Sequence, residues 1–416
     1  MTDIHFYLGE DAVSQLVQYC ETNNLKDFLL VADQNTYPVL GRAVESALQN
    51  RGWDIKSVVF DNPEVVPDED FIVQVLMEAD QVERTYLAVG SGTITDITRF
   101  ASHRTRRPFI SLPTAPSVDG FTSPSASLVI GRIKQTVMAQ PPLAVIADLA
   151  TLAAAPQKMI AAGFGDILGK AIALADWQIS HLIWDSSFSW EISARVQKTL
   201  NACIEAVGEI GRASAEGVQN LMFSLFESGM CMLDFGNSRP AAGAEHYMSH
   251  FLEMKLIREG RPAVLHGAKV GLCSIYAAEL YARLRALDRD TAAARLQATP
   301  QPDRQADIQR IHSVYGSIAD KLVIEQAPYL DMSPNAYSHL QQHLLERWEA
   351  IQAAAAAVPT PQELTDLLRQ AGGATTPAAL GLSDEEVEQA VLHAHLFRNR
   401  FTICKLGRML RLKEGL

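Results

Sequence analysis

The chain has 416 residues, enough for roughly two or three domains, and its 48% hydrophobic and 20% charged residues are typical of a globular protein with a sizeable core. Its formal net charge of −12 argues against nucleic acid or an anionic membrane surface as a partner. No apolar stretch is long enough to predict a membrane span, and five widely spaced cysteines predict reduced thiols, so we expect a cytoplasmic protein.

The first 150 residues alternate short apolar runs with amphipathic stretches. Helices are predicted over 37–50, 69–80 and 95–104, and a hairpin or flap strand is predicted at 127–131. Strands are predicted at 27–33, 55–60, 85–92 (running into a glycine turn), 109–114 and 142–149. Strands that alternate with helices in this way indicate an α/β domain with a parallel, doubly wound sheet.

Helical periodicity dominates the sequence after Ala150, in segments rich in Ala, Leu, Met, Glu and Arg. Helix-breaking segments separate these helices at 237–240, 260–262, 298–303 and 359–362. We therefore predict a dinucleotide-binding α/β domain over 1–155 and an all-helical metal- and substrate-binding domain over 156–416. The active site is expected in a cleft between the two domains.

The stretch AVGSGTITDITRF (88–100) follows the third predicted strand. Gly90 and Gly92 would let the backbone turn tightly and approach a ligand, and the following helix would direct free N–H groups toward a pyrophosphate. The GxGxxG fingerprint is incomplete because Thr95 stands at its third glycine position. An ordinary glycine turn remains an equal alternative for this segment.

The loop LPTAPSVDGFTSPSA (112–126) places several hydroxyls around one carboxylate, Asp119. Such a loop could simply be stabilised by its own polar side chains. It would nevertheless lie at the carboxyl end of a strand, where open α/β sheets bind ligands. Asp33, at the end of the first predicted strand, could accept hydrogen bonds from ribose hydroxyls and would repel a 2′-phosphate, which favours NAD over NADP.

Three further residues have the chemistry of a metal site. Asp166 falls in an apolar predicted helix, where a buried carboxylate needs a cation; the alternative is an ion pair with Lys170 on an exposed face. His246 and His250 are four residues apart on a predicted helix, and His266 follows after a short loop. A histidine pair alone is more often packing or surface, but two histidines and a carboxylate favour a divalent ion with open positions.

These segments, taken together, resemble a known family. GSGTITD, LPTAPSVDGFTS, AAGFGDILGK, GAEHYMSH and LHGAKVG occur in the order that is typical of the sn-glycerol-1-phosphate dehydrogenases. That family belongs to the superfamily of dehydroquinate synthase, glycerol dehydrogenase and the iron-containing alcohol dehydrogenases. The resemblance covers residues 28–270, and FRNRFTICKLG (397–407) is more weakly similar to the C-terminal helix of longer bacterial members.

The resemblance implies a set of functional residues. The metal ligands would be Asp166, His246 and His266, holding zinc, nickel or iron. Asp119 and His250 would be catalytic residues that also bind substrate, together with Asp166. The residues implied for NAD, with NADP also possible, are Asp33, Gly90, Gly92, Thr93, Ile94, Thr95, Asp96, Thr114, Ala115, Pro116, Ser117 and Ser123.

Two positions depart from the pattern of the relatives. Arg99 stands where many carry Lys, which bears on the cofactor phosphate contacts, and Ala242 stands where Ser is common. The residues that hold the substrate phosphate are open, with Lys170, Arg398 and Arg400 as candidates by charge.

The implied activity is reversible hydride transfer between a nicotinamide cofactor and dihydroxyacetone phosphate, giving sn-glycerol 1-phosphate. The alternatives are a dehydrogenase for glycerol or another alcohol, a dehydroquinate-synthase-like lyase, and a non-catalytic NAD-binding regulator. The resemblance also implies a homodimer.

Overall fold

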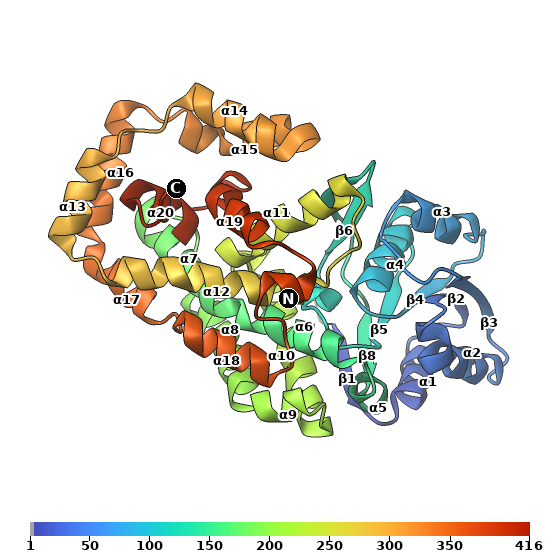
Figure 1. Ribbon diagram of the computed structural model, residues 1–416. Coiled ribbons are helices and arrows are strands. Elements are labelled where there is room, and N and C mark those ends of the chain that lie inside the picture. Colours follow the sequence, from blue (N-terminus) through green and yellow to red (C-terminus); the bar gives the residue numbers. More distant parts are fainter. Residues whose placement is uncertain (1–3) are drawn as a thin grey trace. The chain divides into compact units, whose positions relative to one another are not determined.

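The computed structural model describes residues 4–416 (Figure 1). These residues form two compact units, each defined by the contacts within it. The first unit contains the described residues up to Phe164 together with Glu205–Gly236. The second contains Gly165–Ile204 and Asn237–Leu416. The segment Glu205–Gly236 thus groups with the N-terminal part of the chain, which its helical sequence did not indicate. Among the described helices, none combines the length and the apolar character that a membrane span requires.

The first unit is built on a six-stranded parallel sheet with the strand order β1-β8-β5-β4-β2-β3. Its strands are β1 (His5–Gly9), β2 (Asp27–Asp33), β3 (Asp54–Phe60), β4 (Thr85–Val89), β5 (Phe109–Leu112) and β8 (Ala144–Asp148). The prediction of a parallel α/β sheet is confirmed. Strand β1 was not predicted, because it is a short edge strand whose side chains are only partly buried and so has no continuous buried run.

Helices cover both faces of the sheet, as a doubly wound fold requires. On one face, α1 (Ala12–Thr22) and α2 (Arg42–Gln49) pack on alternate residues of β2 such as Phe28 and Leu30. On the other face, α3 (Glu69–Met77) and α4 (Gly92–Arg104) pack on Leu29 and Val31. The predicted helix over 37–50 begins as a π-helical turn, Tyr37–Gly41, before α2.

Two further parts complete the first unit. The predicted flap is an antiparallel hairpin of β6 (Ser125–Ile130) and β7 (Ile133–Met138), whose turn residues Gly131 and Arg132 both have positive φ. Helices α5 (Leu149–Ala153), α9 (Val207–Gly211) and α10 (Ala215–Phe235) also belong here, and α6 (Gln157–Leu168) crosses the boundary at Phe164.

The described residues of the second unit are helical, as predicted. Its helices are α7 (Lys170–Trp184), α8 (Trp190–Glu205), α11 (Ala244–Glu259), α12 (His266–Arg285), α13 (Arg289–Ala298), α14 (Arg304–Tyr315), α15 (Ala319–Leu330), α16 (Pro334–Glu346), α17 (Trp348–Ala356), α18 (Pro361–Gln370), α19 (Asp384–His393) and α20 (Ile403–Leu410). The predicted breakers mark helix boundaries: the segments 237–240 and 260–262 lie between helices, whereas 298–303 begins with the last residue of α13 and 359–362 ends in the first turn of α18. The five cysteines are buried, and none of them forms a disulfide, as expected.

Candidate functional site

The predicted glycine turn lies at the carboxyl end of β4. Gly90 follows the strand, and α4 begins at Gly92, so the unpaired N–H groups of its first turn face the same edge of the sheet. A Cβ atom on Gly90 would lie 2.6 Å from the Cβ of Ile94, and one on Gly92 would lie 3.1 Å from Cγ2 of Val118. Close packing therefore excludes a side chain at Gly90 and leaves little room for one at Gly92. The turn presents a helix N-terminus that suits a pyrophosphate.

The first turn of α4 carries the other residues that were predicted for the cofactor in this segment. Thr93 and Asp96 are partly exposed, while Ile94 and Thr95 are buried. The Thr95 hydroxyl has no hydrogen-bond partner among the described residues. A buried hydroxyl without a partner at the start of a helix fits a group that accepts or donates a hydrogen bond there.

Arg99 anchors the loop that follows β5. Its guanidinium is fully buried and donates to the backbone oxygens of Gly120 (2.7 Å), Phe121 (3.0 Å) and Ser125 (3.1 Å). It also forms an ion pair with Asp96 at 2.5 Å. Burial raises the pKa of Asp96 to about 6, although the Arg99 charge opposes this rise. Arg99 therefore contacts the protein's own loop, a role that its sequence position did not reveal.

The loop after β5 packs against the glycine turn. Val89 pairs with Leu112 in the sheet, so the segments that follow the two strands leave the same edge side by side. The Ser117 hydroxyl lies 2.5 Å from that of Ser91, which connects the two segments. The remaining residues predicted here for the cofactor, Thr114, Ala115 and Pro116, are buried in this loop.

Asp119 is buried in this loop and fixed by a helix that the sequence did not connect with it. The Ser228 hydroxyl on α10 donates to Oδ2 of Asp119 at 2.9 Å. Two helical glycines make the approach possible. A Cβ on Gly163 would lie 1.8 Å from the Pro116 oxygen, and one on Gly229 would lie 2.6 Å from the Asp119 oxygen. Sequence reasoning missed Ser228 and both glycines, because only tertiary contact reveals them.

Asp33 and Ser123, also predicted for the cofactor, make local hydrogen bonds. Oδ1 of Asp33 accepts from the backbone N–H groups of Asn35 and Thr36, each at 2.8 Å. The Ser123 hydroxyl donates to the Ser125 oxygen at 3.1 Å. In both cases a polar side chain stabilises its own turn, which was the alternative to a ligand-binding role for the loop around Asp119. They leave Oδ2 of Asp33 without a hydrogen bond in the described part of the chain.

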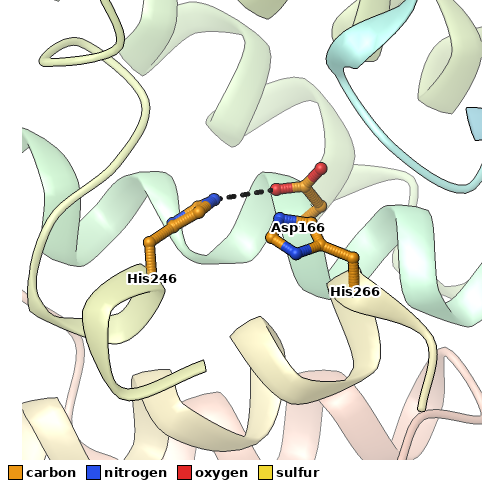
Figure 2. A group of neighbouring side chains, drawn as sticks. All are labelled: Asp166, His246 and His266. Carbon is orange, nitrogen blue, oxygen red and sulfur yellow. Dashed lines mark ion pairs between the residues drawn. The ribbon is translucent and has the colours of Figure 1, made fainter. Parts of the chain in front are cut away.

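In the second unit, Asp166, His246 and His266 come together from α6, α11 and α12 (Figure 2). One potential ligand atom from each lies within 4.8 Å of those from the other two. Nε2 of His246 is 3.6 Å from Oδ1 of Asp166, and the rings of His246 and His266 are 5.2 Å apart between centroids. Asp166 is fully buried and His246 nearly so. The predicted trio therefore forms a compact cluster.

Small residues allow α6 and α12 to bring the trio together. A Cβ on Gly165 would lie 2.4 Å from the Gly267 oxygen, so the helix carrying Asp166 contacts the first turn of α12 through its backbone. His266 is the first residue of α12, and Gly267 follows it directly. Larger side chains at this contact would separate Asp166 from His266.

Charged side chains surround the trio. Burial disfavours the charge of Asp166, but Lys170, at 2.9 Å, and His246 hold the pKa of that carboxyl well below its usual range. Glu245 is fully buried, and its Oε1 lies 2.6 Å from Nδ1 of His246. Burial favours the neutral imidazole, yet Asp166 and Glu245 raise the pKa of His246 to about 9. The site therefore attracts positive charge.

Lys170 does form an ion pair with Asp166, the alternative to a metal ion for this carboxylate, but both side chains are fully buried rather than exposed. Its ammonium is engaged with Asp166, which disfavours Lys170 as the phosphate-binding residue. Glu245 was not singled out from the sequence, although its position next to His246 was a usable signal. A carboxylate that holds the second ring nitrogen is the usual partner of a metal-binding histidine.

His250 lies beside the trio but is not one of its members. Its ring centroid is 6.5 Å from that of His246 and 6.0 Å from that of His266. Oε2 of Glu253 is 3.7 Å from Nδ1 of His250 and 3.5 Å from Nζ of the buried Lys269. Neither Glu253 nor Lys269 was predicted. The Glu253 carboxylate therefore lies between His250 and Lys269.

The donor set fits a divalent metal ion. One carboxylate and two imidazoles are common ligands of zinc, nickel and iron, and they leave coordination positions for other oxygens. Glu245 supplies the orienting carboxylate that such a site normally has. The predicted residues thus fall into two groups. The nucleotide residues and Asp119 belong to the first unit, and the trio and His250 belong to the second.

Known proteins share this sequence and fold. A family model described as iron-containing alcohol dehydrogenase matches residues 7–156. The glycerol-1-phosphate dehydrogenase, NAD(P)+, of Bacillus subtilis is 36% identical over 95% of this chain and 88% of its own length. That of Geobacillus thermodenitrificans is 36% identical over 98% and 93%, respectively. The crystal structure of NADH-dependent butanol dehydrogenase A from Thermotoga maritima matches 99% of this chain and 97% of its own, with a TM-score of 0.62 and 13% identity, which supports the fold.

Proposed function

The chain belongs to the glycerol-1-phosphate dehydrogenase family, and on this premise we propose that it is a metal-dependent dehydrogenase acting on dihydroxyacetone phosphate. The reaction is reversible: the carbonyl carbon takes a hydride from NADH or NADPH, its oxygen takes a proton, and sn-glycerol 1-phosphate and the oxidised cofactor result. The observation that carries the proposal is the cluster of Asp166, His246 and His266.

Each group of residues has a role in this reaction. The glycine turn, the first turn of α4 and the loop 112–126 bind the nicotinamide cofactor, and Asp119 holds substrate. Asp166, His246 and His266 hold a divalent ion, which when bound supplies Lewis acidity toward the carbonyl oxygen. His250, or water beside it, delivers the proton to the oxygen, since an imidazole titrates in the required range.

An absorbance assay tests the proposal. The purified protein is mixed with NADH and, in separate reactions, with dihydroxyacetone phosphate, dihydroxyacetone or buffer, with and without a chelator. We expect NADH oxidation with dihydroxyacetone phosphate, loss of this activity after chelation, and recovery when zinc, nickel or iron is added back. Equal rates with dihydroxyacetone would favour a polyol dehydrogenase. NADH binding without turnover of either substrate would favour a regulator.

We also infer a homodimer in the cytoplasm. Five buried cysteines without a disulfide support a reducing compartment, since disulfides form mainly in oxidising ones. The homodimer rests on family resemblance. Sedimentation equilibrium of the purified protein gives twice the 45.6 kDa chain mass if it is correct, and the mass of one chain if it is not.

A further inference from the structure

Arginines gather next to the first turn of α11, outside the metal cluster. Arg239 lies in the connection between α10 and α11, and Arg398 and Arg400 lie in the segment Phe397–Thr402 before α20. Arg400 donates to the Ala242 oxygen at 3.3 Å and to the Ser238 hydroxyl at 3.1 Å. A small pocket lies here, lined by Asp176, Trp177, Ser180, Arg239, Ala242, Gly243, Arg400, Phe401 and Thr402.

The positive charge of these arginines is poorly neutralised. In the described residues, Arg239 and Arg400 have no carboxylate within ion-pair distance, and Arg398 has only Glu325, at 4.0 Å. Partial burial and the nearby Arg400 lower the pKa of Arg239, so the two guanidinium groups repel each other. Two guanidinium groups at one pocket favour the binding of an anion.

The one carboxylate of the pocket does not supply that anion. Oδ1 of Asp176 accepts from the Tyr281 hydroxyl at 2.7 Å and from the Ile403 N–H at 2.6 Å. Its Oδ2 accepts from the Ala244 N–H at 2.7 Å. Burial, together with the Glu245 charge, raises the pKa of Asp176 to about 7, which reduces its negative charge near neutral pH.

Two buried hydroxyls next to the arginines have no partner among residues 4–416. They belong to Tyr247, whose side chain is 2% exposed, and to Thr402, also 2% exposed, which lines the pocket. The Phe397 ring, next to Arg398, packs against that of Tyr247, which brings the phenol to the arginine segment. Buried hydroxyls are normally hydrogen-bonded, and these can both donate to an anion.

The arginine segment also contacts His250, which lies beside the metal cluster. The Phe397 ring is 5.2 Å from that of His250 and 5.9 Å from that of Tyr247, between centroids. On the other side, Gly243 lines the pocket, and its N–H donates at 2.9 Å to Glu245, which in turn contacts His246. A ligand at the arginines would therefore lie close to a group held at the trio.

We propose that Arg239 and Arg400, with Arg398 beside them and the hydroxyls of Tyr247 and Thr402, bind the phosphate group of the substrate. The inference rests on the proposed function and adds to it the part of the site that selects a phosphomonoester. A guanidinium can give two parallel hydrogen bonds to a phosphate, and hydroxyl donors complete its coordination.

Arg239→Ala is the main test, because the Arg239 side chain makes no hydrogen bond or ion pair in the described structure that its loss would break. Two quantities are measured on the metal-loaded enzyme: the ratio of kcat/KM for dihydroxyacetone phosphate to that for dihydroxyacetone, and the Kd of inorganic phosphate by calorimetry. We expect the ratio to fall, and the Kd to rise, by about tenfold or more. Arg400→Lys, which keeps one charge but not the paired donors, should produce the same changes more weakly.

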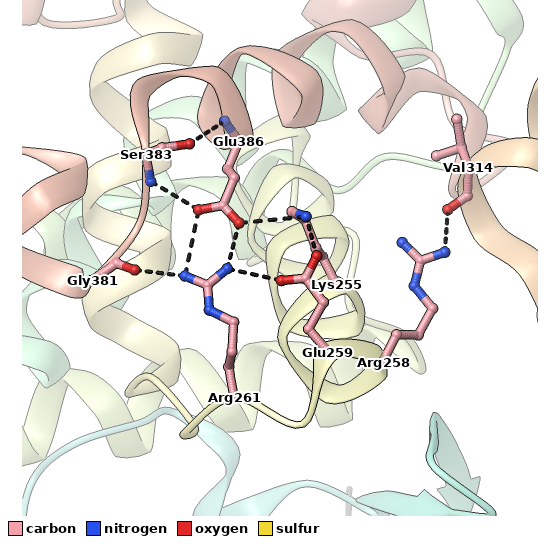
Figure 3. Close-up of polar contacts among 8 residues, drawn as sticks. All are labelled: Lys255, Arg258, Glu259, Arg261, Val314, Gly381, Ser383 and Glu386. Atoms are coloured by element: carbon pink, nitrogen blue, oxygen red, sulfur yellow. Dashed lines mark hydrogen bonds and ion pairs between the residues drawn. The ribbon is translucent and has the colours of Figure 1, made fainter.

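Arg258→Ala is the matched control. Arg258 also lies in the second unit and has no carboxylate partner, but its Nη1 donates to the Val314 oxygen at 2.8 Å (Figure 3). It lines a larger cavity, of about 610 Å³, where Lys255 and the neighbouring Arg261 are paired with Glu386. We expect both measured quantities to remain within about twofold of wild type.

The outcomes separate the two proposals. If wild type reduces dihydroxyacetone phosphate but neither arginine variant changes the ratio or the Kd, the phosphate site is overturned and the proposed function stands. If wild type does not turn over dihydroxyacetone phosphate, the proposed function fails. The phosphate titration then decides by itself whether the arginines bind an anion. Tighter phosphate binding by wild type than by Arg239→Ala then supports the anion site, and equal or absent binding refutes it.

Discussion

Glu245 and Asp166 place two buried carboxylates around the ring of His246, one at each nitrogen. Glu245 Oε1 is 2.6 Å from Nδ1, and Asp166 Oδ1 is 3.6 Å from Nε2. The Glu245 contact leaves Nε2 to face Asp166 and fixes the plane of the ring. Because the His246 ring is already held in one orientation, its side chain loses less conformational entropy when a metal ion binds.

Glu245→Gln tests this positioning role. The amide cannot provide the same charge at Nδ1, so we expect a ten- to hundredfold weaker affinity for zinc, on the order seen for such outer contacts. Competition with a coloured chelator measures this affinity directly and does not depend on turnover. Glu253→Gln, on the same helix beside His250, serves as the control and should retain the affinity. An unchanged zinc affinity in Glu245→Gln would refute the role.

His250 should be separable from the metal ligands. We expect His250→Ala to lower kcat by about 100-fold, the usual size of a general acid's contribution, with bound metal retained. Steady-state kinetics and metal analysis of the same preparation measure both effects. If the variant loses its metal, His250 is a ligand, and the assignment of the trio must be revised.

At the scale of elements, two helical glycines determine whether the Asp119 loop can pack. In α10, Gly229 faces the loop so closely that a Cβ would lie 2.1 Å from Oγ1 of Thr122. Gly163 in α6 contacts the Pro116 oxygen in the same way. At both positions an added Cβ would overlap a backbone oxygen of the loop. Movement of a loop side chain alone therefore cannot relieve the overlap.

Gly229→Ala should therefore destabilise the protein despite the higher helix propensity of alanine. We expect a loss of about 1–3 kcal/mol in the free energy of unfolding, as for an overpacked core position. Gly120→Ala is the control, since a Cβ there meets no atom within 4 Å and should change stability by less than about 0.5 kcal/mol. Urea denaturation compares them, and equal stabilities would show that the loop can move aside.

Asp176 connects several helices of the second unit. It lies on α7 and accepts from Tyr281 on α12, from Ala244 at the start of α11 and from Ile403 at the start of α20. Its pKa is raised to about 7, mainly by burial. A carboxyl whose pKa is raised on folding stabilises the protein fully below the unfolded pKa, near 4, and loses that contribution as pH rises through 7.

Asp176→Asn should alter the pH dependence accordingly. Relative to wild type, we expect the variant to be less destabilised at pH 8 than at pH 5, by more than about 1 kcal/mol, because an amide does not ionise. Denaturant unfolding at the two pH values measures this difference. Asp290→Asn, at an exposed position of α13, is the control and should show no such difference. A pH-independent effect of Asp176→Asn would contradict the raised pKa.

For the whole molecule, the sequence predicts the fold class and the order of the helices and strands better than it predicts which segments contact one another. The parallel sheet and the helical remainder follow from apolar periodicity, and both are confirmed, as is the family resemblance. A carboxylate in an apolar helix and histidines at helical spacing predicted a metal site, but the choice of Asp166, His246 and His266 as the trio depended on the family resemblance. Strand β1 was missed because an edge strand has no continuous buried run.

Other features of the site depend on contacts between segments that are distant in the sequence. The sequence shows only that Arg99 stands where many relatives carry Lys, whereas the structure shows that it binds the oxygens of Gly120 and Phe121. Ser228 shares no motif with Asp119, which it contacts across 109 positions of the chain. The grouping of Glu205–Gly236 with the first unit has the same origin, since periodicity identifies a helix without indicating its neighbours.

Metal analysis of wild type and His266→Ala, each purified and then equilibrated with zinc, tests the central claim most directly. If Asp166, His246 and His266 hold one ion, wild type contains about one zinc per chain and the variant retains almost none. NADH binding, measured by fluorescence, should survive in the variant. A full equivalent of zinc in His266→Ala, or none in wild type, would contradict the account.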